Sequence, residues 1–294
     1  NRIVDDWMDA NKRPGIEEIY GPIGDWDVSS CTNFNSLFYQ KSTFNSDISK
    51  WNVENVINLH ATFYGNSAFN SDISSWNILK VTSLQYTFYQ ATSFNRDLSD
   101  WQTGKVTTMQ QMFRSASSFN GDVSKWDTSN VVTLQQTFQG ASSFNNNVSN
   151  WITSSVTDMS SMFDSASAFN SDIIQWITSS VTDMSYMFKK ASTFNSDLSK
   201  WITSPSVTDM SSMFEEASAF NSDISKWITS SSSVTDMSSM FEEASAFNSD
   251  LSKWQTDKVI TMQEIFEDSG FTRALCGGAW ESLTGDDNAF KKLG

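Results

Sequence analysis

The chain has 294 residues, and its 34 acidic and 19 basic side chains give a net charge of −15. Such an excess of carboxylates disfavours nucleic acids and anionic membrane surfaces as partners. The sequence contains no apolar run of about 18 residues, so it predicts no direct insertion into a membrane.

The first predicted element is a short helix within residues 2–12. Ile3, Val4, Trp7 and Met8 follow helical spacing, and the Pro-Gly pair that comes next ends the pattern. Residues 1–25 are therefore predicted to form an N-terminal helical cap. A solenoid needs such a cap because its first coil would otherwise expose apolar side chains and an unpaired strand edge.

A unit of about 25 residues repeats from Trp26 onward. Tryptophan recurs every 25 residues from Trp26 to Trp201, and then with slightly longer gaps at Trp227 and Trp254. Phenylalanine recurs about twelve and about eighteen positions after each tryptophan. These fixed columns predict a single solenoid over residues 26–270, in which each coil contacts only its neighbours, followed by a C-terminal cap over residues 271–294.

Each unit is predicted to contain a strand and a short helix. Ile173, Trp176 and Thr178 follow the L-x-x-L-x-L spacing of leucine-rich-repeat strands, and the column two after tryptophan is β-branched. From Val156 onward the apolar residues lie three or four apart, as on one helix face, and Asp158 suits a first helical turn. The sequence therefore predicts an α/β repeat fold, a right-handed leucine-rich-repeat-like solenoid of about ten coils. A parallel sheet would line one side, and short helices the other.

Two polar columns accompany the second phenylalanine column. They begin with Asn45 and Asp47 and recur in the following coils. One interpretation is a stacked ladder that satisfies backbone groups in a turn. The other is a row of calcium ligands, because carboxylate and amide oxygens suit that ion; against it, Asn147 replaces the aspartate in one coil.

The two cysteines do not decide the compartment. Cys31 and Cys276 lie near opposite ends of the array, on the order of 40 Å apart at the rise expected per coil, well beyond the reach of a disulfide. Cys31 occupies a column that is valine in other coils, so we expect it to be a small buried apolar residue.

No catalytic, cofactor or metal site is predicted. His60 is the only histidine, and the repeat supplies no partners for a Ser-His-Asp or histidine-metal arrangement. The carboxylates come as one per coil instead of as a unique pair in a cleft. The methionines fall in two columns that read as core. We therefore expect a protein that is not an enzyme and uses no cofactor.

The repeat resembles the BspA-like leucine-rich-repeat surface proteins. The motifs that carry the resemblance are W-D-T-S-N-V at 126–131, V-T-D-M-S-S-M-F at 156–163 and F-N-S-D-I-S at 220–225. The flanking segments 20–28 and 275–280 look like those of algal versions. The resemblance implies secreted or surface-attached proteins of adhesion or recognition, without shared enzymatic chemistry. The chain departs from the family in having no further cysteine after Cys276.

The predicted binding site is an apolar stripe just after the tryptophans. This column is polar in the early coils and then becomes isoleucine, flanked by two lysines: Ile152, Ile177, Ile202, Ile228, Lys200 and Lys226. A contiguous exposed apolar stripe is typical of a partner interface, although strand propensity or recent duplication of one unit would give the same pattern.

The function predicted from the sequence is non-enzymatic. We expect an extracellular or cell-surface recognition, adhesion or assembly protein that binds a protein or glycan partner through the sheet face. The alternative is a protein that binds ice, a mineral or calcium-bridged polysaccharide through its Thr, Ser and Asp columns.

Overall fold

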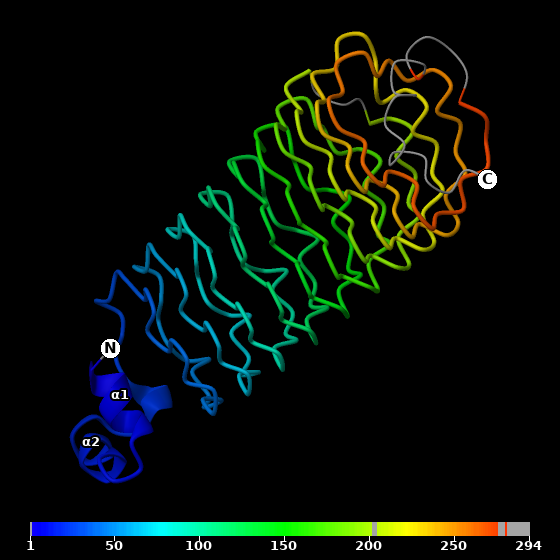
Figure 1. Ribbon diagram of the computed structural model, residues 1–294. Coiled ribbons are helices and arrows are strands. Elements are labelled where there is room, and N and C mark those ends of the chain that lie inside the picture. The colour runs from blue at the N-terminus through cyan, green and yellow to red at the C-terminus, as the bar shows by residue number, and fades with distance from the viewer. Residues whose placement is uncertain (1, 202–204, 276–279, 281–294) are drawn as a thin grey trace.

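The computed structural model describes residues 2–201, 205–275 and 280, and shows an elongated array of coils that starts beside helices α1 and α2 (Figure 1). Three helical elements precede the coils: α1 (Arg2–Met8), α2 (Arg13–Tyr20) and the 3₁₀ helix η1 (Ile23–Asp25). No helix in this part of the chain has the length and apolar content needed to cross a membrane.

Helix α1 packs on the first coil through Trp7. The indole ring of Trp7 is buried and meets the ring of Phe44 edge-on, with the ring centres 6.2 Å apart. Its Nε1 donates a 3.2 Å hydrogen bond to Glu17 of α2, and Lys41 of the first coil forms an ion pair with Asp5. The two helices are thus held to each other and to the array.

Ten successive coils are joined by parallel β-bridges, one between each pair of neighbours, from Asn33↔Asn58 to Asp236↔Thr261. The bridging residue lies seven positions after the tryptophan in the regular coils. The prediction of a repeat solenoid of about ten coils is therefore confirmed; its right-handed winding stays a prediction.

The predicted short helices do not form in the described residues of the coils. In their place is a ladder segment, which we define as the stretch from six to fifteen residues after the tryptophan, 107–116 in the fourth coil. Alternate backbone N–H groups donate to the next coil and to the same coil: Phe113 N to Thr137 O at 2.9 Å, and Met112 N to Met109 O at 3.0 Å. The parallel ladder thus lies on residues that were expected to be helical.

The backbone conformation of the ladder segment is incompatible with the predicted helix. Two positions in every ladder segment have φ between 51° and 71°, for example Gln111 and Ser115 at 55° and 59°. Because a right-handed helix requires negative φ at every residue, two left-handed residues four apart exclude it. The left-handed residues turn the chain so that residues three or four apart point into the core. This gives the apolar spacing that resembles a helix in the sequence.

In the described coils, the predicted strand beside the tryptophan forms no continuous backbone ladder. There, neighbouring coils are linked mainly through side chains: Trp176 Nε1 donates to Val148 O at 3.0 Å, and Thr153 Oγ1 donates to Ile177 O at 2.9 Å. The inward orientation predicted for the threonine column is correct at Thr153 and Thr178, which are buried. The parallel sheet was therefore assigned to the wrong segment of the coil.

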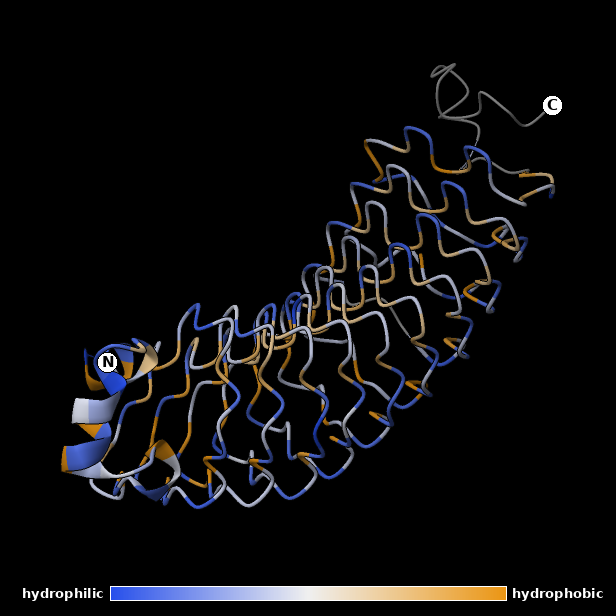
Figure 2. Ribbon diagram, turned by 90° about the horizontal axis from the view of Figure 1, so that it is seen from below, coloured by the Kyte–Doolittle hydropathy of each residue, from blue (hydrophilic) through white to orange (hydrophobic). Residues whose placement is uncertain are grey.

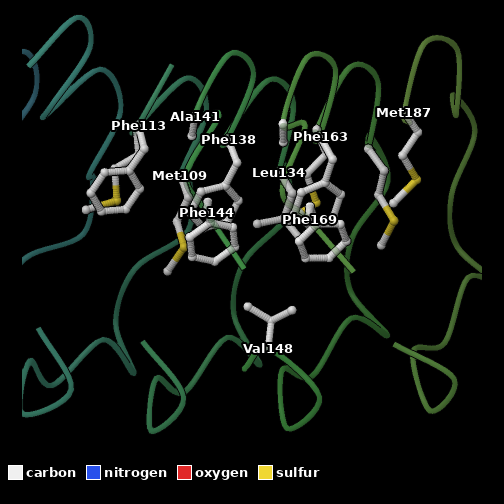
Figure 3. Close-up of a cluster of buried hydrophobic side chains, with 14 of the residues drawn as sticks. Met109, Phe113, Leu134, Phe138, Ala141, Phe144, Val148, Phe163, Phe169 and Met187 are labelled. Carbon is white, nitrogen blue, oxygen red and sulfur yellow. The ribbon is translucent and has the colours of Figure 1, made fainter. Parts of the chain in front are cut away.

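The core consists of stacked columns of identical side chains. Phe138 stacks on Phe113 and Phe163 at 5.5 and 5.7 Å, and on Phe144 of its own coil at 3.8 Å (Figure 3). Figure 2 shows the same apolar positions recurring along the curved array. The methionines of the coils are buried in this core, as predicted.

Candidate functional site

The structure divides the predicted isoleucine stripe. Ile152 and Ile177 are 48% and 52% exposed, and Lys200 and Lys226 are exposed. Ile202 lies outside the described residues. Ile228 is only 1% exposed, so its assignment to the stripe is wrong.

A two-residue insertion explains the burial of Ile228. The run Ser230–Ser233 lengthens the connection after Trp227, and Thr229 is exposed where other coils bury a threonine. Ile228 takes the inward place, and its carbonyl accepts a 3.0 Å hydrogen bond from Gln255 N. The sequence column therefore shifts by one position in this coil.

A different, non-repeating cluster lies on the ladder segments of the first coils. Tyr39, Tyr64 and Tyr89 occupy the column thirteen after tryptophan, and their rings stack at 4.7 and 4.3 Å. Tyr39 is 42% exposed, and the other two are half-buried. We call these three residues together with Tyr86 the tyrosine ridge.

Tyr86 lies across the edges of the stacked rings. Its ring centre is 6.1 Å from that of Tyr89 at an interplanar angle of 63°, and His60 meets it edge-on at 5.4 Å. Arg114, one coil further along the column, places its guanidinium over Tyr89 at 5.5 Å. The ridge thus begins at the exposed ring of Tyr39 and ends beside the guanidinium of Arg114. The contact of this cation with the ring of Tyr89 is favourable.

The phenol of Tyr64 in the middle of the ridge stays protonated at neutral pH. Burial raises the pKa of Tyr64, and the neighbouring phenols Tyr89 and Tyr39 raise it further, whereas Arg114 acts in the opposite direction. A protonated phenol both donates and accepts a hydrogen bond. The ridge therefore combines aromatic surface with hydroxyl groups.

Amide side chains continue from the ridge along the same face. Gln85 donates to the side-chain oxygen of Gln110, Gln110 donates to that of Gln135, and Gln135 Nε2 donates to Ser160 Oγ at 3.3 Å. Arg114 Nη1 also donates to the amide oxygen of Gln136 at 3.1 Å. The residues nine to fourteen after tryptophan in the first five coils include no Asp or Glu.

The same columns become acidic in the later coils. Carboxylate oxygens of Glu242, Glu264 and Glu267 lie within 4.8 Å of one another. Burial raises the pKa of Glu242, and the nearby carboxylates add to this effect. Lys189 and Glu215 form an ion pair of 2.8 Å beside this cluster. Half-buried carboxylates can gather in this way without a metal, and the structure gives no further sign of a cation there.

The Asn and Asp columns are structural in the described coils. The side-chain oxygen of each asparagine accepts a hydrogen bond from the backbone of the next one, as between Asn70 and Asn95 N at 3.0 Å. Asp72 accepts from Ser74 N at 3.0 Å, and Asn147 makes the same turn with Ser149 N at 2.9 Å. The stacked-ladder interpretation accounts for both columns, because an amide replaces the carboxylate without loss of the turn.

Two exposed threonines use their hydroxyl protons within the solenoid. A second threonine column, six after tryptophan, faces outward at Thr107 and Thr182. Thr107 Oγ1 donates to Thr82 O at 3.2 Å, and Thr182 Oγ1 donates to Thr157 O at 3.0 Å. Both hydroxyl protons are donated to carbonyl oxygens of the preceding coil, so they are not available to bind ice.

Cys31 is exposed instead of buried, which corrects the prediction. It lines a cleft of about 640 Å³ between α1 and the first coil, together with Trp26 and Phe34. Later coils bury the equivalent valine, such as Val56, under the preceding coil. The first coil has no predecessor, so its cysteine faces this cleft. Cys276 lies outside the described residues.

A family model matches most of the chain. The Mycoplasma protein of unknown function family, DUF285, matches residues 11–126, 107–206 and 203–290. The chain belongs to this family. The predicted BspA-like resemblance is confirmed at the level of DUF285 repeats, and the algal-type flanks stay a prediction. None of the curated proteins matches the sequence.

Solved leucine-rich-repeat structures show weak similarity to this DUF285 chain. A TLR13–ssRNA13 complex is 10% identical, with a TM-score of 0.26, over 83% of this chain and 45% of that one. An internalin from Listeria monocytogenes is 12% identical, with a TM-score of 0.18, over 74% and 82%. The functional domain of InlJ from the same organism is 9% identical, with a TM-score of 0.22, over 78% and 57%. These scores are low, so the description of the fold depends on the DUF285 coils themselves.

The sequence analysis missed the tyrosine ridge, although a signal for it was present. Four of the six tyrosines in this DUF285 chain fall between positions 39 and 89. They occupy positions that vary from coil to coil, so the invariant columns give no sign of them. Departures from a repeat, more than the repeat, mark where a DUF285 solenoid can carry a specific site.

Proposed function

We propose that this DUF285 chain is a non-enzymatic recognition module of an extracellular or cell-surface protein. It binds a protein or glycan partner through the exposed face of its ladder segments. The observation that carries the proposal is the tyrosine ridge, whose aromatic side chains depart from the repeat on an exposed face.

The fold does not need the ridge. Later coils stack equally well with Gln139 in the column of Tyr89, and with Ser161 in the column of Tyr86. Tyrosines at the surface that add nothing to the repeat architecture are typical of binding sites, because Tyr combines a large contact area with a polar end. Adhesion or recognition at the surface, as in the BspA-like proteins that the repeat resembles, agrees with this interpretation.

The alternative function has less support. Binding of ice or a mineral would use free hydroxyls in a regular array, whereas the described hydroxyls of Thr107 and Thr182 donate within the solenoid. The algal-type identity and the surface location remain part of the proposal.

The experiment compares the wild-type protein with a ridge variant on arrays of extracellular proteins and glycans. The variant carries Tyr39→Gln, Tyr64→Gln, Tyr89→Gln and Tyr86→Ala. Glutamine is already present in the first column at Gln139, and alanine in the second at Ala61. We expect the variant to fold and to lose the specific binding of the wild type.

The matched control is Tyr186→Ala. Tyr186 shares the column of Tyr86, has nearly the same φ of 58°, and is 39% exposed. It should bind like the wild type. Retention of all wild-type binding by the ridge variant would show that the ridge is not the binding surface.

A further inference from the structure

The ladder face of the first five coils has a chemical character distinct from the rest of the molecule. We define the amide face as the residues nine to fourteen after tryptophan in these coils: 35–40, 60–65, 85–90, 110–115 and 135–140. It carries phenol, amide and hydroxyl groups and no carboxylate, whereas the protein as a whole has a net charge of −15. Apart from the guanidinium of Arg114, a partner on this face meets phenol, amide and hydroxyl donors and acceptors.

The amide groups are held in place before any ligand arrives. The side chains of Gln85, Gln110 and Gln135 are linked by hydrogen bonds from coil to coil, and the row ends on Ser160. Each linked amide still has a free N–H or a free lone pair for another molecule. Fixed side chains lose little entropy on binding, so such a row favours recognition of a polar ligand.

The aromatic groups stand beside this row. Tyr86 is turned out of the ring stack by 63° relative to Tyr89 and lies next to Gln85 in the chain. Tyr39 is stacked by Tyr64, the only ring that contacts it in the described residues. Aromatic surface flanked by fixed amides suits a sugar, which has an apolar C–H face and a rim of hydroxyls. Protein interfaces usually have a more apolar centre.

The repeat distance gives a second, independent argument. Neighbouring coils joined by a parallel ladder lie about 4.8 Å apart. A hexose advances an extended β-linked chain by a similar length, so a glycan along the solenoid axis brings successive sugars, with alternate rings turned over, past the amides of successive coils.

We propose that the amide face binds an uncharged, extended β-linked glycan lying along the solenoid axis, with the tyrosine ridge as its aromatic platform. This inference depends on the proposed recognition function and names the ligand class of the same face.

The test is calorimetric titration of the 294-residue protein with cellohexaose, and with maltohexaose and hexagalacturonate as comparisons. We expect cellohexaose to bind, maltohexaose to bind more weakly because its α-linked chain curves, and hexagalacturonate to bind no better. Binding of an uncharged ligand should change little between low and high salt.

Two single variants place the ligand on the face. Tyr86→Ala and Gln110→Ala should each raise the Kd for cellohexaose, by about tenfold for the tyrosine. Tyr186→Ala should leave it unchanged. Thermal melts confirm folding, and Ala61 shows that the column of Tyr86 accepts alanine at a φ of 51°.

The outcomes separate the two proposals. Absence of cellohexaose binding by the wild type, preference for hexagalacturonate, or equal loss in Tyr186→Ala would overturn the glycan inference. If the ridge variant then loses a protein partner from the array, the recognition function stands with a different ligand. If the ridge variant keeps all the binding of the wild type, both proposals are wrong.

Discussion

Trp176 Nε1 donates a 3.0 Å hydrogen bond to the carbonyl oxygen of Val148, 28 positions earlier in the chain. The same bond recurs along the array, as from Trp101 to Ile73 and from Trp254 to Ile224. Each indole thus fills the core and also ties its coil to the preceding one. This bond explains why tryptophan, and not another large apolar residue, begins every coil.

The first prediction follows from this bond. Trp176 is 4% exposed and stacks on Trp151 and Trp201, so Trp176→Ala should lower the free energy of unfolding by about 3–5 kcal/mol. Trp176→Phe keeps much of the volume and should lose about 0.5–1.5 kcal/mol, because the carbonyl of Val148 loses one hydrogen bond and keeps the one from Trp151 N at 3.1 Å. Urea denaturation measures both. An unchanged free energy of unfolding in Trp176→Phe would show that the hydrogen bond contributes nothing.

The left-handed column supplies the second prediction. Gln90 has a φ of 56° in the column that contains glycine at Gly65 and Gly140. Gln90→Gly should stabilise the fold by up to about 1 kcal/mol, because the left-handed conformation costs a non-glycine residue about 1–2 kcal/mol and the added chain entropy of glycine offsets part of the gain.

Gly140→Ala is the converse variant. A Cβ at Gly140 would meet nothing nearer than Ser115 Oγ at 3.4 Å, so the expected loss of about 1–2 kcal/mol is conformational and not steric. In chemical denaturation, the free energy of unfolding should therefore change in opposite directions in the two variants. Movement in the same direction would contradict this account of the ladder segment.

The third prediction concerns the aspartate turns. Hydrogen bonds from the backbone N–H and then the hydroxyl of Ser74 hold the pKa of Asp72 below its usual value. A lowered folded-state pKa contributes stability above the unfolded pKa of about 4, and this stability is lost as the pH falls through the folded pKa. Asp72→Asn should keep the turn, as Asn147 does, and reduce the fall in melting temperature in acid. Asp72→Ala should lower the melting temperature at every pH.

The fourth prediction concerns the acidic cluster. Because the folded-state pKa of Glu242 is raised, its ionisation weakens the fold as the pH rises through that pKa. Glu242→Gln should therefore raise the melting temperature at neutral pH, and the gain should vanish below about pH 4, where carboxyls are protonated. Glu243→Gln, on the adjacent exposed residue, is the control. A gain that persists in acid would have another cause than charge.

The fifth prediction retains the exposed part of the isoleucine stripe. Ile152→Asn with Ile177→Asn restores the residue of Asn52 and Asn77 in the same column, so the fold should remain intact. Loss of exposed apolar surface should reduce self-association or partner binding, which sedimentation and the arrays measure. Ile228→Asn should instead destabilise the protein, by about 2–5 kcal/mol, because Ile228 is buried. Unchanged association in the double variant would remove the stripe as a site.

The sequence by itself determined the repeat, the number of coils and the side chains of the core. Identical residues at a fixed period must occupy equivalent places, so the Trp, Phe and Met columns indicated a stacked core without any knowledge of the backbone. Trp176, Phe138 and Met162 are buried as this reasoning requires.

Tertiary structure alone decided which segment forms the ladder. Inward residues three or four apart fit a helix, but they fit equally a chain with left-handed residues such as Ser161 and Ser165, and only contacts between coils select the second. Glycine at 65 and 140 was the one local sign of this conformation. Burial of Ile228 and the meeting of Tyr86 with His60 were also beyond prediction. They depend on how an insertion shifts one coil, and on which side chains adjacent coils bring together across 25 or so residues of sequence.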